Sequence, residues 1–298
     1  MSDLGFCIHQ QLGAYRLVSL LGKGKSGEVW SAISEKNNQA VALKVFRGGT
    51  KAHSMALHEY ETATRWSHPN LLEPLELCGF DGHWGMVMPL CVGRSVDGVA
   101  GYVQEKHIWQ LLHDVSTALF VLHQQGWGHF DVKPSNILWD DSHFILSDFG
   151  SCHKVGMDNA EALVTSDNSS YRFDAPELTC GIQCEASDIW SLGATVFYLF
   201  MGCHVFYGLG GRAQKQESVV PYMRKNLPDL SVLIGRCLAY DYRLRPTADE
   251  IRELSRLQLE EGKWMKENRA LKQEECVLDK VNDTMAFWPE EMRMNKCK

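Results

Sequence analysis

Up to residue 90 the apolar positions come in short runs, rich in β-branched residues and bounded by Gly, Asn and Lys. This pattern is typical of β-strands. One longer stretch, residues 54–66, has a helical pattern and stops before His68-Pro69-Asn70, because a proline disfavours helical conformation in the residue ahead of it. The predicted strands cover residues 15–22, 28–34, 40–46, 72–80 and 84–90.

Beyond residue 91 the apolar positions take the spacing of amphipathic helices. Residues 105–125 keep the i, i+3, i+4, i+7 pattern and are followed by Gly126, a residue type that often ends helices. Further helices are predicted over residues 187–201 and 227–239, and from Thr247 onward, where Thr247 and Glu250 match a capping box. The apolar positions of the first helix are Ile108, Leu111, Leu112, Val115, Ala118, Leu119 and Leu122.

The change of pattern predicts an α+β, bilobal fold, with a small β-rich lobe followed by a larger α-helical lobe. We expect an N-terminal extension over residues 1–13, the small lobe over 14–90 and the large lobe over 91–257. Residues 258–298 are rich in charge and read as a helical tail outside the core.

Residues 189–211 contain no Asp, Glu, Lys or Arg, and about 20 apolar residues are enough to cross a bilayer. The alternative is a helix buried on all sides in a large core. Polar Ser191, Thr195 and His204, together with the glycines near the end of the run, favour the buried helix.

Composition narrows the range of partners. The chain has 30 Lys and Arg against 37 Asp and Glu, so nothing indicates a nucleic-acid-binding protein led by phosphate contacts. The 10 cysteines are too sparse for a small disulfide scaffold, and residues 1–13 lack the features of a secretory signal peptide. We therefore expect reduced thiols and a soluble cytoplasmic protein without a membrane span.

Residues 22–27, GKGKSG, match the pattern GxGxxG, which is a weak signal alone. A strand pattern follows, whereas a dinucleotide-binding loop needs a helix there. The phosphate-loop pattern GxxxxGK[ST] fails because its first glycine would fall on Ser19. Either a plain β-turn or a glycine-rich hairpin that lets backbone N–H groups approach phosphates remains.

Lys44 stands in a strand pattern between apolar Leu43 and Val45. A lysine held inside a buried strand is costly unless an anion meets it. The helix that follows offers Glu59 as the partner, with Glu61 as the alternative. An ordinary surface lysine, which is common in strands, is the competing explanation.

Taken together and in order, these and further motifs resemble those of eukaryotic-type (Hanks-type) protein kinases over residues 15–257. The motifs are GKGKSGEV at 22–29, VALKVF around Lys44, GHFDVKPSN at 128–136, DFG at 148–150, APE at 175–177, SDIWSLG at 187–193 and RLRPT at 243–247.

The resemblance implies ATP and Mg²⁺ as cofactors and a protein substrate. Lys44, paired with Glu59, would hold the α- and β-phosphates, and Asp131 would orient or accept the proton of the substrate hydroxyl. Lys133 would steady the γ-phosphate. Asn136 and Asp148 would bind Mg²⁺, which prefers oxygen ligands.

The remaining nucleotide contacts follow from the same resemblance. Residues of the glycine-rich loop would cover the phosphates, side chains from both lobes would sandwich the adenine ring, and the connection between the lobes would contact its edge. These residues are Gly22, Lys23, Gly24 and Gly27 for the loop, Val29, Ala42 and Leu138 for the ring, and Met88, Pro89 and Cys91 for the connection.

Other positions bear on the kind of kinase. Lys133 resembles Ser/Thr kinases, as does Ser170, where such kinases place a Thr that contacts the catalytic Asp and Lys. Asp188 would brace the catalytic-loop backbone, and Glu177 would pair with Arg245. A catalytically weak or silent scaffold and a small-molecule kinase are the alternatives.

Phe130 replaces the Arg that most regulated kinases place before the catalytic Asp. That Arg pairs with a phosphate on the activation loop, which here is residues 151–174 between the DFG and APE motifs, so we expect an enzyme that depends little on such phosphorylation. Candidate phosphosites are Thr165, Ser166, Ser169 and Ser170. The tail has Trp264, Met265, Phe287 and Trp288 as apolar anchors. It would contact a regulatory partner or the large lobe itself, with a loose, exposed helix as the equal alternative.

Overall fold

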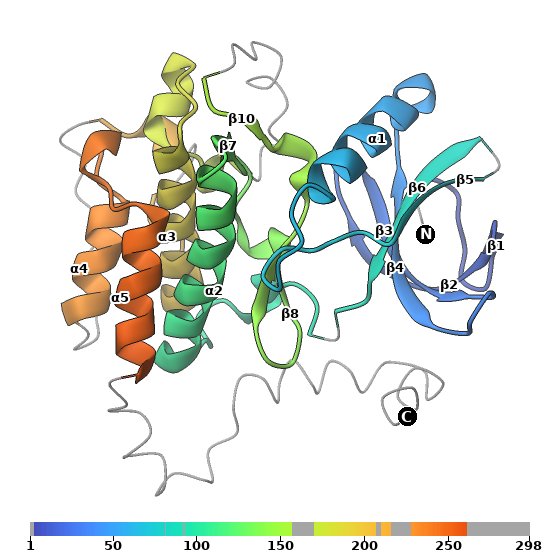
Figure 1. Ribbon diagram of the computed structural model, residues 1–298, viewed down its shortest axis with the longest axis horizontal. Helices are drawn as coiled ribbons and strands as arrows, with labels where there is room; N and C mark the ends of the chain where they lie inside the picture. Colours follow the sequence, from blue (N-terminus) through green and yellow to red (C-terminus); the bar gives the residue numbers. More distant parts are fainter. Residues whose placement is uncertain are drawn as a thin grey trace, which may run out of the picture.

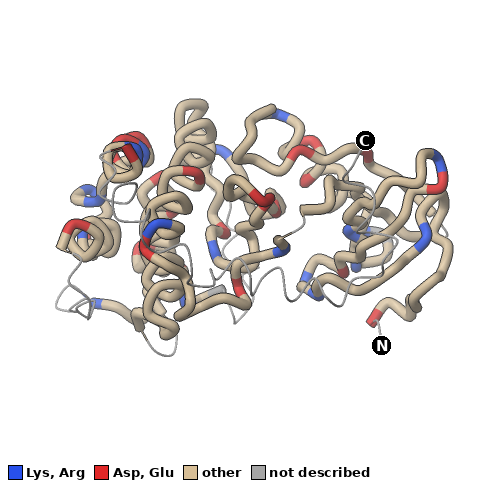
Figure 2. Tube along the Cα trace, turned by 90° about the horizontal axis from the view of Figure 1, so that it is seen from below, with Lys and Arg blue, Asp and Glu red and all other residues tan. Residues whose placement is uncertain are grey.

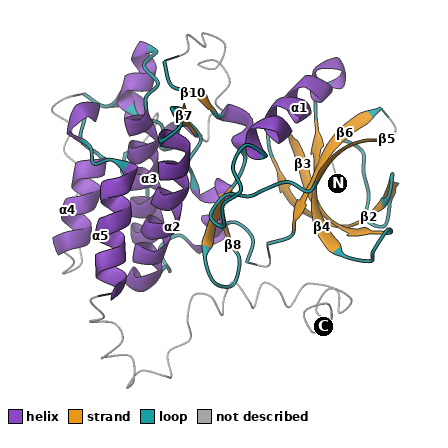
Figure 3. Cartoon of the chain, in the orientation of Figure 1, coloured by secondary structure: helices purple, strands orange, loops and turns teal. Residues whose placement is uncertain are grey.

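The computed structural model describes residues 3–80, 82–91, 93–156, 170–206, 210–215 and 228–260. An antiparallel sheet with one helix forms a small lobe, and the other helices form a large lobe beside it (Figure 1). Figure 3 shows the long strands gathered in the small lobe and the long helices in the large one. The predicted α+β, bilobal architecture is therefore confirmed.

The strands of the small lobe are β1 (Gln11–Leu12), β2 (Tyr15–Lys23), β3 (Gly27–Ser34), β4 (Ala40–Phe46), β5 (Glu76–Phe80) and β6 (His83–Pro89). The short strands of the large lobe are β7 (Trp127–Gly128), β8 (Ile137–Trp139), β9 (Phe144–Leu146) and β10 (His153–Lys154). The α-helices are α1 (Ala52–Ala63), α2 (Glu105–His123), α3 (Glu185–Met201), α4 (Pro228–Cys237) and α5 (Ala248–Glu260).

The sheet has the order β1-β2-β3-β4-β6-β5, and all its neighbouring strands are antiparallel. Successive side chains of a strand point to opposite faces. On β4, Leu43 therefore packs in one apolar cluster while Ala42 and Phe46 pack in another, against Ala56 of α1. Lys44 has the parity of Ala42 and Phe46, so it points toward α1.

The N-terminal residues pack on this sheet. Phe6 and Leu12 are buried in the same cluster as Leu17 and Trp30, and β1 extends the sheet by pairing with β2. The predicted extension over residues 1–13 is thus built into the lobe where it is described.

Two predicted elements are shorter in the structure than in the pattern. Strand β5 starts at Glu76 instead of residue 72, because Pro74 lacks an N–H and the N–H of Leu72 donates to the Leu146 carbonyl in the large lobe. Helix α1 ends at Ala63, and Trp66 beyond it is buried in the large-lobe core.

The uncharged run forms most of α3, which lies in the middle of the large lobe. Its Trp190 and Phe197 are buried, and Gly202 ends the helix with φ 71°. Gly193 permits close packing, since a Cβ there would lie 2.7 Å from the Cβ of Cys237 in α4. Among the described helices, none is long and apolar enough to cross a membrane.

Helices α2 and α5 pack side by side, and the Thr247–Glu250 capping box is present at the start of α5. Figure 2 shows charged positions of both signs in both lobes. The two lobes face each other across the connection that follows β6, and the sequence motifs converge there.

Candidate active site

The glycine-rich loop is the hairpin turn between β2 and β3. The Gly24 N–H donates to the Gly27 carbonyl at 2.9 Å and closes the turn. Gly27 is required by close approach, since a Cβ there would lie 2.0 Å from the Val45 carbonyl oxygen. Lys23 forms an ion pair with Asp3 at 2.7 Å, which ties the loop to the N-terminal segment. The loop is therefore a strand–turn–strand hairpin.

Lys44 lies in a buried ion-pair network. Its Nζ lies 2.7 Å from both carboxylate oxygens of Glu59 and 3.0 Å from Oδ1 of Asp148. Burial alone lowers the pKa of Lys44, but the carboxylates of Asp148 and Glu59 together hold that pKa above its ordinary value. The ammonium therefore stays charged, and its helix partner is Glu59, since Glu61 is exposed.

Side chains of residues 128–136, which we call the catalytic loop because they resemble that loop of protein kinases, converge on Asp131. Lys133 donates to Oδ2 of Asp131 at 2.8 Å, and the Asn136 amide donates to the same oxygen at 2.9 Å and to the Asp131 carbonyl at 2.8 Å. Burial raises the pKa of Asp131, while Lys133 opposes the rise. The arrangement fixes a carboxylate at the surface between the lobes.

The backbone beneath this loop is anchored by Asp188 at the start of α3. Its carboxylate accepts the N–H groups of His129 at 2.8 Å and Phe130 at 2.7 Å, and His123 Nε2 lies 2.9 Å away. Because Asp188 is fully buried, these bonds are protected from water. Asp188 therefore holds the loop backbone through the contacts that the sequence predicted.

Asp148 and Asn136 offer oxygen atoms suited to a hard cation. The backbone of Asp148 has φ 65°, and the side chain of Phe149 beside it is buried against His129. Burial works against ionisation of Asp148, but Lys44 holds its pKa below the ordinary value. Asn136 uses its amide nitrogen on Asp131, so its oxygen is the atom that would bind a metal ion. A carboxylate and an amide oxygen fit Mg²⁺.

Apolar side chains line the interface above Leu138. Val29 of β3, Ala42 of β4, Met88 of β6 and Leu138 of β8 belong to one cluster, together with Cys91. Pro89 lacks an N–H, so at that position only the carbonyl can meet a ligand. The structure thus brings together the residues expected to sandwich an adenine ring.

Comparison with known proteins decides the family. The protein kinase domain model matches residues 15–255. The chain belongs to the protein kinase family. This kinase is similar to calcium-dependent protein kinase 5 of Plasmodium berghei, with 30% identity over 76% of this chain and 42% of that protein.

Two further relatives cover most of the chain. A "Probable cell division protein kinase" of Encephalitozoon cuniculi is 28% identical over 80% of this chain and 96% of its own length. A membrane-associated tyrosine- and threonine-specific cdc2-inhibitory kinase of Caenorhabditis elegans is 27% identical over 80% of this chain and 36% of its own length. The chain spans less than half of the length of the Plasmodium relatives.

Some expected residues of the kinase lie outside the described part. Ser170 begins a short turn, Ser170–Arg172, but its side chain is outside the description, as are Thr165, Ser166 and Ser169. The apolar anchors of the tail, from Trp264 onward, also lie outside the described residues.

The Glu177–Arg245 pair joins the end of the activation segment to the last helices. Arg245 donates to both carboxylate oxygens of Glu177, at 2.7 and 2.8 Å, and both side chains are buried. Arg245 also donates to the carbonyls of Ala186 and Ala239. The pair is fully satisfied and locks the segment onto the large lobe.

Sequence reasoning missed a second buried pair. Asp174 lies 2.7 Å from Arg212 in the turn after α3, and burial raises the pKa of Asp174 to about 6, although Arg212 lowers it. Repulsion by the Asp131 carboxylate also raises the pKa of Asp174. Sequence motifs give no signal for such a pair, because Asp174 and Arg212 lie far apart along the chain.

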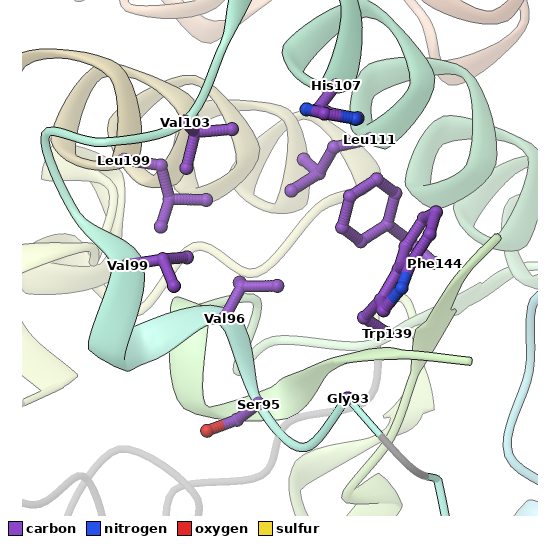
Figure 4. A pocket seen from close by; sticks show the side chains of 10 residues that line it. All are labelled: Gly93, Ser95, Val96, Val99, Val103, His107, Leu111, Trp139, Phe144 and Leu199. Carbon is purple, nitrogen blue, oxygen red and sulfur yellow. The ribbon is translucent and has the colours of Figure 1, made fainter. Parts of the chain in front are cut away.

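A small apolar cavity lies in the large lobe, away from these charged groups (Figure 4). Its volume is about 30 Å³. The side chains of Val96, Val99, Val103, Leu111 and Leu199 point into it, with His107 at one edge. The lining is mainly apolar, and the cavity lies between α2, α3 and the β8–β9 hairpin.

Proposed function

We propose that the chain transfers the γ-phosphoryl group of ATP to serine or threonine hydroxyls of protein substrates. The observation that carries the proposal is the intact charge set between the lobes, in which Lys44 contacts Glu59 and Asp148 while Asp131 is held by Lys133 and Asn136. A silent kinase-fold scaffold usually lacks one of these groups.

Each residue has a separate part in the proposed transfer. Lys44 binds the α- and β-phosphates, and Lys133 the transferred group. Asp131 orients the acceptor hydroxyl and takes its proton as the new bond from oxygen to the γ-phosphorus forms and the bond to the bridging oxygen of ADP breaks. Asn136 and Asp148 would hold Mg²⁺, which neutralises charge on the phosphates when bound.

The acceptor class is supported by Lys133, two residues after Asp131, a position typical of Ser/Thr kinases. The similarity to a tyrosine- and threonine-specific kinase makes the acceptor worth measuring directly. Phospho-amino-acid analysis of a labelled peptide library should yield phosphoserine and phosphothreonine. Phosphotyrosine as the main product would contradict this part of the proposal.

We further propose that activity depends little on activation-loop phosphorylation, because Phe130 cannot pair with a phosphate.

An intracellular location is supported by the thiols of Cys91, Cys152 and Cys237, which are free and buried. Transfer from labelled ATP by wild type, compared with Asp131→Asn, tests the activity itself. Equal signals from the two proteins, with ATP binding intact in both, would favour the scaffold.

A further inference from the structure

Phe130, next to the proposed catalytic Asp131, packs its ring against another aromatic residue. Its backbone has φ 58°, and its N–H donates to Asp188. The ring centroid lies 4.4 Å from that of His153, with 30° between the two planes. His153 belongs to β10, the strand directly after the DFG motif. The stack therefore joins the catalytic loop to the start of the activation segment.

Gly128 makes room for this stack. A Cβ at position 128 would lie 2.2 Å from Cζ of Phe130, with two further ring carbons within 2.7 Å. Gly128 is not among the residues with positive φ, so its backbone does not need a glycine. A glycine is required at position 128 because the Phe130 ring occupies the space that a Cβ would fill. The residue at position 128 therefore has to fit the residue at position 130.

His153 extends the contact to the far end of the segment. Its Nε2 lies 2.7 Å from Oε1 of Gln183, and its Nδ1 lies 2.8 Å from the Ser151 carbonyl oxygen. Next to Gln183, the Ile182 N–H donates to the carbonyl of Glu177, the residue locked by Arg245. Both ends of the segment between residues 151 and 183 are thus joined through one buried imidazole.

We propose that Phe130, His153 and Gln183, with Gly128 providing the space, form an aromatic brace that positions the activation segment for transfer. The contacts are ring stacking and hydrogen bonds, which need no phosphate anion. The inference rests on the proposed kinase activity. It assigns to these contacts the positioning of the activation segment that a phosphate provides in other kinases. These are positioning residues, because none contacts the reacting groups described above.

The kinetic test uses the full chain with Phe130→Leu, His153→Ala and Gln183→Leu. Each should lower kcat by about 10- to 100-fold, because small displacements of positioned groups are costly. The KM for ATP should stay within about twofold, because Lys44 and Asp148 keep their contacts. Lys154→Ala, an exposed neighbour on the same strand, serves as the control and should retain full kcat. An unchanged kcat in all three brace variants would overturn the proposal.

A double-mutant cycle tests the match between Gly128 and Phe130. Gly128→Ala should lower kcat when Phe130 is present, because the methyl group displaces the ring. In a Phe130→Ala background the same substitution should add little, because no ring remains to be displaced. Additive losses would contradict the brace and indicate two unrelated local defects.

Amide hydrogen exchange separates this inference from the proposed activity. The brace variants should exchange the amides of residues 175–183 at least about 10-fold faster than wild type, and Lys154→Ala should not. Binding of an ATP analogue shows that each variant is folded. If wild type transfers no phosphate yet the exchange difference is present, the activity fails and the brace stands. Unchanged exchange at residues 175–183 overturns the brace.

Discussion

At the scale of single residues, the chemistry depends on buried charged side chains and on the partners that hold each of them. The sequence predicted Lys44, Asp131, Asn136 and Asp148 as a set because their motifs occur in order. It favoured Glu59 as the partner of Lys44 and kept Glu61 as the alternative. The structure selects Glu59, because Glu59 lies on the buried face of α1 that points toward β4. Glu61 lies on the opposite, exposed face of the helix.

Glu59→Gln should lower kcat/KM by about 10- to 100-fold, because Lys44 loses a charged partner and shifts toward Asp148. Glu61→Gln is the matched control, and steady-state kinetics at varied ATP measures both. A large loss in Glu61→Gln with none in Glu59→Gln would contradict the pairing.

Arg245 and Arg243 stand two residues apart in the same motif but in opposite environments. Arg245→Met should destabilise the protein by about 3–5 kcal/mol, because it leaves the Glu177 carboxylate buried without its partner. Arg243 is 76% exposed in its pair with Asp241, and Arg243→Met should leave stability unchanged. Chemical denaturation compares the two, and similar losses would refute the assignment of burial.

The brace around Phe130 could not be predicted from the residues alone. Phe130 reads as the loss of an arginine, and His153 and Gln183 lie too far along the chain for any local pattern to join them. Only the β7–β10 pairing, which sets His153 opposite Gly128, brings them together. Gly128 gave no signal in the sequence, because its φ and its close approach to the Phe130 ring are known only from the structure.

At the scale of elements, apolar runs of seven residues or more located the main strands and helices to within a few residues. Two- and three-residue strands such as β7 and β10 carry no period and were missed. The burial of Phe6 was missed for a similar reason, since one apolar residue in a short segment gives no pattern. The formation of such short strands and the burial of single residues depend on tertiary contacts, which a local sequence pattern does not show.

The N-terminal segment should therefore contribute to stability. Phe6→Ala should lower the free energy of unfolding by about 3–5 kcal/mol, because Phe6 is 7% exposed and packs in the small-lobe core. Ile8, which is 56% exposed, provides the control, and Ile8→Ala should change stability by less than about 0.5 kcal/mol. Thermal unfolding measures both, and equal losses would show that Phe6 is not part of the core.

At the scale of the whole molecule, the two lobes supply different halves of one site. The small lobe brings the glycine-rich hairpin and Lys44, for which we propose phosphate binding, and the large lobe brings Asp131 with the side chains that hold it. The large-lobe core contains the apolar cavity of Figure 4. Filling the cavity with Val99→Ile should stabilise the protein by about 1 kcal/mol. Exposed Val232→Ile is the control for thermal unfolding, and a loss of stability in Val99→Ile would show that the space is already filled.

The central claim is that this kinase transfers phosphate without needing a phosphorylated activation loop. The most direct measurement is the initial rate of transfer from labelled ATP by phosphatase-treated wild type. Untreated wild type and Asp131→Asn are assayed beside it, and intact mass confirms that phosphate has been removed. We predict that the treated enzyme keeps most of its rate and that Asp131→Asn has almost none. A treated enzyme as inactive as Asp131→Asn, which recovers when its loop is phosphorylated, would contradict the account.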